Sequence, residues 1–356
     1  MLDFEALSPD APAIILLCSS VGTDRQAGAA RPLGPRTWAK LSERLAQRSL
    51  RGPRDLVGLT PDEIDRSLDV GGDEAARYAG LLARGGQLAF ELDRLRSRGI
   101  WVVTIADDAY PARLIQRLRV DAPPVLFGSG HFGSGDALGL DRGGIAIVGS
   151  RDADAAAVAF TERLASAAAR GEIPVVSGGA RGIDVTAMRA AAEAGGTVVG
   201  VLPEGVERRL REGDTRAAVA SGRVVLVSPY HPGAAFSAGA AMGRNKIVYG
   251  LSDLAVVVSS AVGSGGTWTG AIEAIEGGWV RVLVRDGPDA PDGNRALLGK
   301  GGVPFPGEAL VGDQLSLAGL VALAPPLAPP RERSAAEAAT TYEQQPLFED
   351  RAGPGP

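Results

Sequence analysis

Short apolar runs alternate with alanine-rich stretches from about residue 99 onward. The runs are rich in β-branched residues, for example GIAIVGS at 144–150 and IPVVSGG at 173–179. Longer stretches with helical spacing separate them, such as 155–172 and 184–196. Strands that are apolar throughout and joined by helices are typical of a parallel sheet covered on both faces. The pattern therefore predicts an α/β fold with a doubly wound, mostly parallel, extended Rossmann-like sheet.

The first hundred residues have a different pattern. Trp38, Leu41 and Leu45 recur at helical spacing. Thr60, with Glu63 three residues later, predicts a helix that begins with a capping box. We therefore expect a small N-terminal helical domain over residues 1–98, similar to a SAM or helix-hairpin-helix module. Such a domain serves either as an interaction or DNA-contact platform or as a structural cap.

Two boundaries follow from these changes in pattern. The extended Rossmann-like domain is expected over residues 99–324. Residues 325–356 combine proline pairs, charges and small side chains, which predicts a disordered tail.

Composition narrows the class of protein. The formal net charge of the 356 residues is −5, which argues against coating nucleic acid or membrane by bulk charge but allows a local basic pocket. The single cysteine, Cys18, excludes an internal disulfide and a cysteine-based zinc cluster. We expect no metal and no cofactor. The chain opens without a signal-like segment, and its apolar runs fall short of the roughly 20 residues of a membrane span, so we expect a cytoplasmic protein with no membrane partner.

The candidate chemistry lies where the predicted strands end. In a doubly wound sheet, ligands bind beyond the carboxyl ends of the strands. Glycines there let backbone N–H groups approach an anion, and arginine offers a fork that matches phosphate. The candidate phosphate-binding residues at these ends are Ser150, Arg151, Ser177, Gly178, Gly179, Arg181, Arg244, Asn245, Lys246, Gly265, Gly266 and Thr267.

Two familiar phosphate motifs are absent from the sequence. The stretch SGGARG at 177–182 has adjacent glycines and an arginine, unlike the Gly-x-Gly-x-x-Gly dinucleotide fingerprint. The chain also has no Gly-x-x-x-x-Gly-Lys-Ser/Thr, so ATP hydrolysis by a P-loop is not expected. A single nucleotide and a nucleic-acid strand both remain open as the ligand.

A set of motifs in a fixed order resembles the DNA-processing protein A (DprA/Smf) family over about residues 99–306. The motifs are YPARL at 110–114, IAIVGSR at 145–151, VVSGGARGID at 175–184, GRNK at 243–246 and GSGGTWTGAIEA at 263–274. The resemblance implies a protein that binds single-stranded DNA without strong sequence preference, forms a homodimer and helps to load a RecA-type recombinase during natural transformation. It also implies that Arg151, Arg181, Arg244 and Lys246 line the DNA pocket.

Some positions depart from the family pattern. Met188 stands where the family has histidine, and additional residues separate Phe236 from Arg244. These departures predict a divergent member, for which transformation, recombinational repair and phage defence remain open.

The stretch GGTWTGAIE also resembles the cytokinin-activating phosphoribohydrolases, which share this superfamily. Gly265, Gly266, Thr267 and Glu273 partly match the pattern Pro-Gly-Gly-x-Gly-Thr-x-x-Glu. The alternative function is therefore a nucleotide sensor, or an enzyme in which Glu273 stabilises an oxocarbenium-like ribose. The solvated face of a helix is the simpler explanation of Glu273, because charged helix positions usually face water. Our leading expectation is a DNA-binding protein that is not a catalyst.

The expected tail contains YEQQPLFED at 342–350. Gln344, Leu347 and Phe348 resemble the peptide that docks bacterial proteins onto the replication sliding clamp, and a short apolar anchor in a disordered segment suits docking. This predicts a third role, that of an adaptor. The alternative is a tail that happens to carry two apolar residues.

Overall fold

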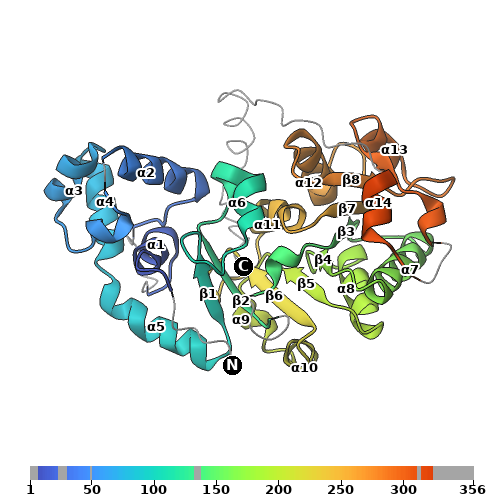
Figure 1. Ribbon diagram of the computed structural model, residues 1–356, viewed down its shortest axis with the longest axis horizontal. Helices are drawn as coiled ribbons and strands as arrows, with labels where there is room; N and C mark the ends of the chain where they lie inside the picture. Colours follow the sequence, from blue (N-terminus) through green and yellow to red (C-terminus); the bar gives the residue numbers. More distant parts are fainter. Residues whose placement is uncertain (1–6, 23–29, 49, 132–137, 311–313, 324–356) are drawn as a thin grey trace, which may run out of the picture.

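The computed structural model describes residues 7–22, 30–48, 50–131, 138–310 and 314–323. Within these ranges, five α-helices come before the first strand and lie together at one end of the molecule (Figure 1). They are α1 (Ala11–Cys18), α2 (Pro35–Gln47), α3 (Pro61–Leu68), α4 (Gly72–Leu82) and α5 (Gly85–Ser97). The predicted capping box is confirmed at α3, where Thr60 Oγ1 accepts from the Glu63 N–H and Glu63 Oε2 accepts from the Thr60 N–H.

The predicted sheet is confirmed, and in the described residues it has nine strands. Their spatial order is β1-β2-β6-β5-β4-β3-β7-β8-β9. The pairs β1–β2 and β2–β6 are antiparallel and all other pairs are parallel. The strands are β1 (Trp101–Thr104), β2 (Val125–Ser129), β3 (Ile145–Gly149), β4 (Val175–Ser177), β5 (Val198–Val201), β6 (Val224–Ser228), β7 (Leu254–Ser259), β8 (Arg281–Val284) and β9 (Val303–Pro304).

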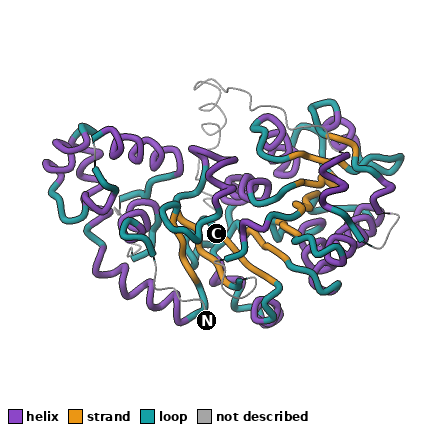
Figure 2. Tube along the Cα trace, viewed as in Figure 1, coloured by secondary structure: helices purple, strands orange, loops and turns teal. Residues whose placement is uncertain are grey.

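Helices cover both faces of the sheet (Figure 2). Successive strand residues face opposite sides, so Ile145 and Ile147 join one buried cluster while Ala146 and Val148 join another. The first face is covered by α7 (Ala155–Arg170) and α8 (Ile183–Glu193), and the second by α6 (Ala112–Leu118), α11 (Ala238–Gly250), α12 (Gly265–Glu276) and α13 (Asp292–Leu298). The remaining helices are α9 (Val206–Arg209), α10 (Gly213–Ala220) and α14 (Leu317–Leu323). Within the described ranges, no helix is long and apolar enough to cross a membrane.

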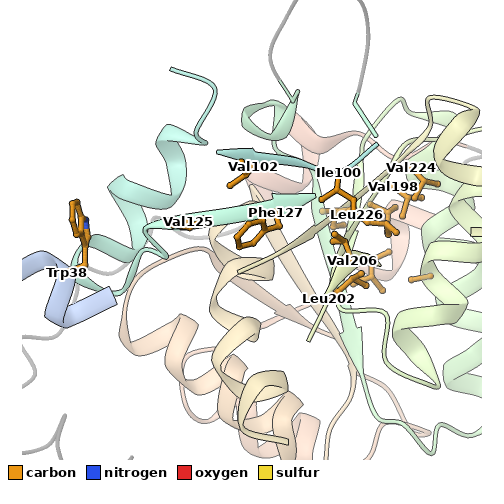
Figure 3. Close-up of a cluster of buried hydrophobic side chains, with 14 of the residues drawn as sticks. Trp38, Ile100, Val102, Val125, Phe127, Val198, Leu202, Val206, Val224 and Leu226 are labelled. Atoms are coloured by element: carbon orange, nitrogen blue, oxygen red, sulfur yellow. The ribbon is translucent and has the colours of Figure 1, made fainter. Parts of the chain in front are cut away.

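The N-terminal helices share their core with the sheet. Ile14 and Leu17 of α1 belong to the same buried cluster as Val102 of β1 and Phe127 of β2. Figure 3 shows the strand side of this cluster, where Phe127 lies near Leu226 of β6. The last of these helices, α5, ends at Ser97 and the first strand begins at Trp101, and the apolar packing continues from the helices into the sheet.

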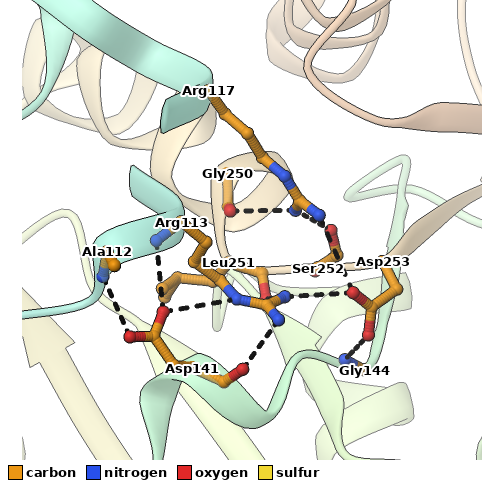
Figure 4. Close-up of polar contacts among 9 residues, drawn as sticks. All are labelled: Ala112, Arg113, Arg117, Asp141, Gly144, Gly250, Leu251, Ser252 and Asp253. Atoms are coloured by element: carbon orange, nitrogen blue, oxygen red, sulfur yellow. Dashed lines mark hydrogen bonds and ion pairs between the residues drawn. The ribbon is translucent and has the colours of Figure 1, made fainter. Parts of the chain in front are cut away.

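A polar cluster fixes the starts of two neighbouring strands (Figure 4). Arg113 of α6 donates to Asp253 Oδ1 at 3.2 Å and to the carbonyl of Asp141 at 2.7 Å. Asp253 in turn accepts from the Gly144 N–H at 2.8 Å, and Arg117 donates to the carbonyl of Gly250 at 3.0 Å. These contacts hold the turns that precede β3 and β7 together. The relative position of β3 and β7 matters for function, because residues at the carboxyl ends of both strands line the first pocket of the candidate site.

Candidate nucleic-acid interface

A groove follows the carboxyl ends of the central parallel strands. It consists of two adjoining pockets. The first pocket, about 370 Å³, is lined by the β3–α7 turn, by α11 and by the start of α12. The second pocket, about 620 Å³, is lined by the β4–α8 turn and by residues 203–212 after β5. Arg151, Ala180 and Arg244 line both pockets, so the two form one elongated groove.

Arg244, on α11, is a cation at the floor of this groove. Its side chain belongs to a residue that is only 3% exposed, and its Nε has no hydrogen-bond partner among the described residues. Burial lowers the pKa of Arg244, and the nearby charge of Asp184 opposes that shift. A buried guanidinium with an unused N–H, lining two pockets, has the chemistry to bind an anion.

Asp184, on α8, is the internal counter-charge. Burial raises its pKa from 3.8 to about 6, although Arg244 and the backbone N–H groups of Ala180, Gly149 and Gly178 each act to lower it. The Gly178 N–H donates to Asp184 Oδ2 at 3.2 Å. The glycine turn therefore binds an anion as its sequence suggests, but at Gly178 that anion is a carboxylate of the same motif.

Ser177, the last residue of β4, and Gly178 and Gly179, which follow it, have different roles. Ser177 is fully buried and donates to the carbonyl of Ile147 at 2.7 Å, so it holds β4 to β3. Gly178 leaves room for Arg244, because a Cβ on Gly178 would collide with Nη1 of that arginine. Gly179, with φ of 66°, lines the second pocket. Ser177 and Gly178 thus build the frame of the groove, and Gly179 forms part of its wall.

The exposed arginines lie along the rim. Arg151 follows β3, and its guanidinium lies 5.7 Å from the ring centre of Phe236. Ser150, beside it, lines the first pocket, and its hydroxyl accepts from the Asp152 N–H at 3.1 Å. Arg181 lines the second pocket and pairs with Asp152 at 2.5 Å. Arg181 therefore lies at the predicted edge of the sheet. A DNA phosphate would have to displace Asp152 in order to pair with it.

Two further arginines line the second pocket, Arg208 and Arg209, which were not predicted as site residues. Arg209 pairs with Glu204 at 2.8 Å and donates to the carbonyl of Gly179 at 3.2 Å. Both arginines follow β5, so the rule that ligands bind beyond strand ends could have found them.

The start of α12 closes the first pocket. Gly265, Gly266 and Thr267 all line it, as predicted for one site. Thr267 Oγ1 donates to the carbonyl of Gly149 at 2.9 Å, and Asn245 Nδ2 donates to the carbonyl of Gly266 at 3.0 Å. These two bonds fix the helix N-terminus against β3 and α11.

The remaining predicted site residues that the structure describes do not line either pocket. The Lys246 ammonium is 3.6 Å from Asp121, which also pairs with Arg36 of α2, and Lys246 lines neither pocket. Glu273 lies two helical turns beyond Gly265 and likewise lines neither pocket. The tail residues Gln344, Leu347 and Phe348 are outside the described residues. In the parts that the structure describes, no group of three or more His, Cys, Asp or Glu side chains is placed to hold a metal ion.

The fold and the groove define a class: a Rossmann-like protein with a cationic groove suited to phosphate groups at the carboxyl edge of its sheet. Comparison with protein families identifies the family within this class. The model of the family described as DNA recombination-mediator protein A matches residues 101–298, more than half of the chain. The chain belongs to this family.

Known relatives agree with that assignment. A putative DNA processing protein DprA of Mycobacterium tuberculosis is 30% identical over 224 residues, which cover 60% of this chain and 55% of the relative. The DNA processing protein DprA of Streptococcus pneumoniae is 31% identical over 163 residues, covering 46% and 55% respectively. The chain thus spans about half the length of the curated relatives it matches. The crystal structure of DNA processing protein A from Streptococcus pneumoniae has a TM-score of 0.56 at 24% identity, covers 76% of this chain and 92% of that one, and shows a shared fold.

Proposed function

We propose that this chain binds single-stranded DNA in the groove and acts in DNA processing and recombination in the cytoplasm. The observation that carries the proposal is that two pockets join into one groove and share Arg151 and the buried Arg244. An elongated groove with cations along its length suits a strand with repeated phosphates better than a single nucleotide. The family's description as a recombination mediator agrees with this function.

The groove offers two kinds of contact to a strand. Arg151, Arg181 and Arg244 supply guanidinium groups for phosphodiester oxygens. Phe236, 51% exposed beside Arg151, offers a ring face on which a base can stack. Neither contact depends on base identity, so we expect binding with little sequence preference.

The proposed function is binding without catalysis. The carboxylate that a phosphoribohydrolase would need, Glu273, is two helical turns from the start of α12 and outside both pockets. This position supports DNA binding over the enzymatic alternative.

We extend the proposal to the partners that the family resemblance implies. These are a second copy of the chain, a RecA-type recombinase that receives the bound strand, and a sliding clamp contacted by the tail. Family membership in the recombination mediators supports the recombinase.

Titration of oligo-dT by fluorescence anisotropy at two salt concentrations tests the proposal. We expect Arg151→Ala to weaken binding about tenfold and to reduce the magnitude of the log–log salt slope by about 0.7, the value for one lost phosphate contact on a single strand. The matched control is Arg66→Ala, an exposed arginine of α3 that lines neither pocket. Absence of binding by the wild type, or equal effects of both variants, would refute the proposal.

A further inference from the structure

The N-terminus of α12 faces the first pocket without a side-chain cap. The helix has 12 residues, and its N-cap, Ser264, makes no side-chain hydrogen bond to the first turn. Gly265 and Gly266 follow, so no Cβ covers the first two N–H groups of the helix. The first turn of an α-helix carries N–H groups with no partner inside the helix and a partial positive charge.

A second cationic group lines the same pocket. Arg244, 3% exposed, has an Nε with no hydrogen-bond partner among the described residues. Asp184 accepts from backbone N–H groups of two turns. Among the described residues, it supplies the only carboxylate in the lining of this pocket. The pocket thus combines an uncapped helix N-terminus with a buried guanidinium that has an unused N–H.

We propose that the first pocket holds the terminal phosphate monoester of a DNA strand, while the second pocket holds its internal phosphodiesters. An internal phosphodiester has one negative charge and two free oxygens. A terminal monoester has about −1.5 to −2 charges at pH 7 and three oxygens that accept hydrogen bonds. A helix N-terminus and a guanidinium together match that larger charge and number of acceptors.

The volumes of the pockets fit this division. The first pocket, about 370 Å³, is at the small end of the usual range for ligand sites and suits one nucleotide. The second, about 620 Å³, leaves room for more of the strand. The inference rests on the proposed function, because a strand must lie in the groove before its end can reach α12.

The experiment compares oligo-dT of one length with a 5′-phosphate, a 3′-phosphate or hydroxyls at both ends, at pH 7.5 and fixed salt. We expect at least one phosphorylated form to bind about tenfold tighter than the hydroxyl form, given the strength of charge interactions at a helix N-terminus. Ser264→Asp places a carboxylate at the N-cap, where Asp is favoured, so the helix stays stable while the phosphate loses its site. In this variant we expect the ratio of the two dissociation constants to fall to about 1.

The matched control is Ser237→Asp at the N-cap of α11. Ser237 already accepts from the Ala240 N–H at 3.1 Å, so Asp keeps that cap and adds the same charge near the groove. This variant should weaken the binding of both oligonucleotides equally and preserve the ratio of their dissociation constants.

Equal affinity of the wild type for all three oligonucleotides would overturn the inference and leave the proposed function intact. No binding of the hydroxyl form would overturn the proposed function itself. Competition by dTMP at the concentration at which the oligonucleotide binds would assign the pocket to a free nucleotide and also overturn the inference.

Discussion

At the scale of single residues, the groove depends on what surrounds Arg244. Its guanidinium lies against Gly178, and the charge of Asp184, at the start of α8, acts on it. Tyr230, Glu204 and Arg151 also act on its charge from three other segments. A buried cation of this kind is sensitive to small changes in shape and in protonation.

Gly178→Ala tests whether the site depends on the space that Gly178 leaves for the Arg244 guanidinium. A Cβ on Gly178 would collide with Nη1 of Arg244, so the guanidinium or the turn must move. We expect the free energy of unfolding to fall by about 1–3 kcal/mol, as for other overpacked positions, and affinity for oligo-dT to fall about tenfold. Urea denaturation and anisotropy measure the two effects. Gly213→Ala is the control, because a Cβ there meets nothing within 4 Å, and it should change neither quantity appreciably.

Asp184 predicts a dependence of DNA binding on pH. Its pKa of about 6 means that the carboxylate is ionised at pH 7.5 and mostly protonated at pH 5.5. Protonation removes the negative charge beside Arg244, so affinity for hydroxyl-ended oligo-dT should rise about threefold as pH falls across this range. Hydroxyl ends are needed because a terminal phosphate titrates in the same window. Asp184→Asn should flatten the profile, and an unchanged profile in that variant would assign the titration to another group.

At the scale of elements, α9 connects the groove to the N-terminal helices. Arg208 and Arg209 of α9 line the second pocket. Glu207, also in α9, pairs with Arg94 of α5 and with Arg98, the residue that follows α5. The Arg94–Glu207 distance is 3.4 Å, and the Glu207 side chain is 12% exposed. A partly buried ion pair between two elements is worth more than a pair in open solvent.

Glu207→Gln tests this connection. The variant removes the charge that Arg94 of α5 and Arg98, just after it, share. We therefore expect the free energy of unfolding to fall by about 1–2 kcal/mol in urea denaturation. Glu162→Gln removes the partner of Arg189 in a pair where both side chains are largely exposed. That control should lower the free energy of unfolding by less than about 0.5 kcal/mol. Equal losses for the two variants would show that the ion pairs of Glu207 contribute no more than an exposed pair.

At the scale of the whole molecule, the described residues form a helical layer and a sheet with one continuous buried cluster between them. Continuous packing favours cooperative unfolding of both parts. The chain contains four tryptophans, which allow each part to be followed separately. Trp38 lies in α2, whereas Trp101 lies in β1, Trp268 in α12 and Trp279 in the turn between α12 and β8.

We therefore predict that both parts unfold together. A variant that keeps only Trp38, with the other three replaced by Phe, and the variant Trp38→Phe should give coincident urea midpoints by fluorescence. An earlier transition reported by Trp38 would establish residues 1–98 as an independent folding unit, and the shared core would then be an interface between domains.

The order of elements could be predicted from the sequence because its causes are local. Apolar β-branched runs specify buried strands, and Thr60 with Glu63 specifies the start of α3. The rule for strand ends also brought Ser150, Arg151, Arg244 and Thr267 to one pocket, since the carboxyl ends of parallel strands meet at one edge. The antiparallel pairing of β2 with β6, which extends the sheet, joins segments about a hundred residues apart and has no local signal.

The direction of each side chain was decided only by the tertiary structure. The sequence placed Ser177, Gly178, Arg244 and Lys246 at one predicted site, yet Ser177 bonds to β3, Gly178 leaves room for Arg244, and Lys246 pairs with Asp121. Each of these partners is distant in sequence, so no local pattern could reveal it. The sequence by itself determined the sheet and the edge at which phosphate-binding residues gather. Long-range packing and charge pairing decided which of those residues face the groove, because a polar side chain turns toward whichever partner the fold brings within reach.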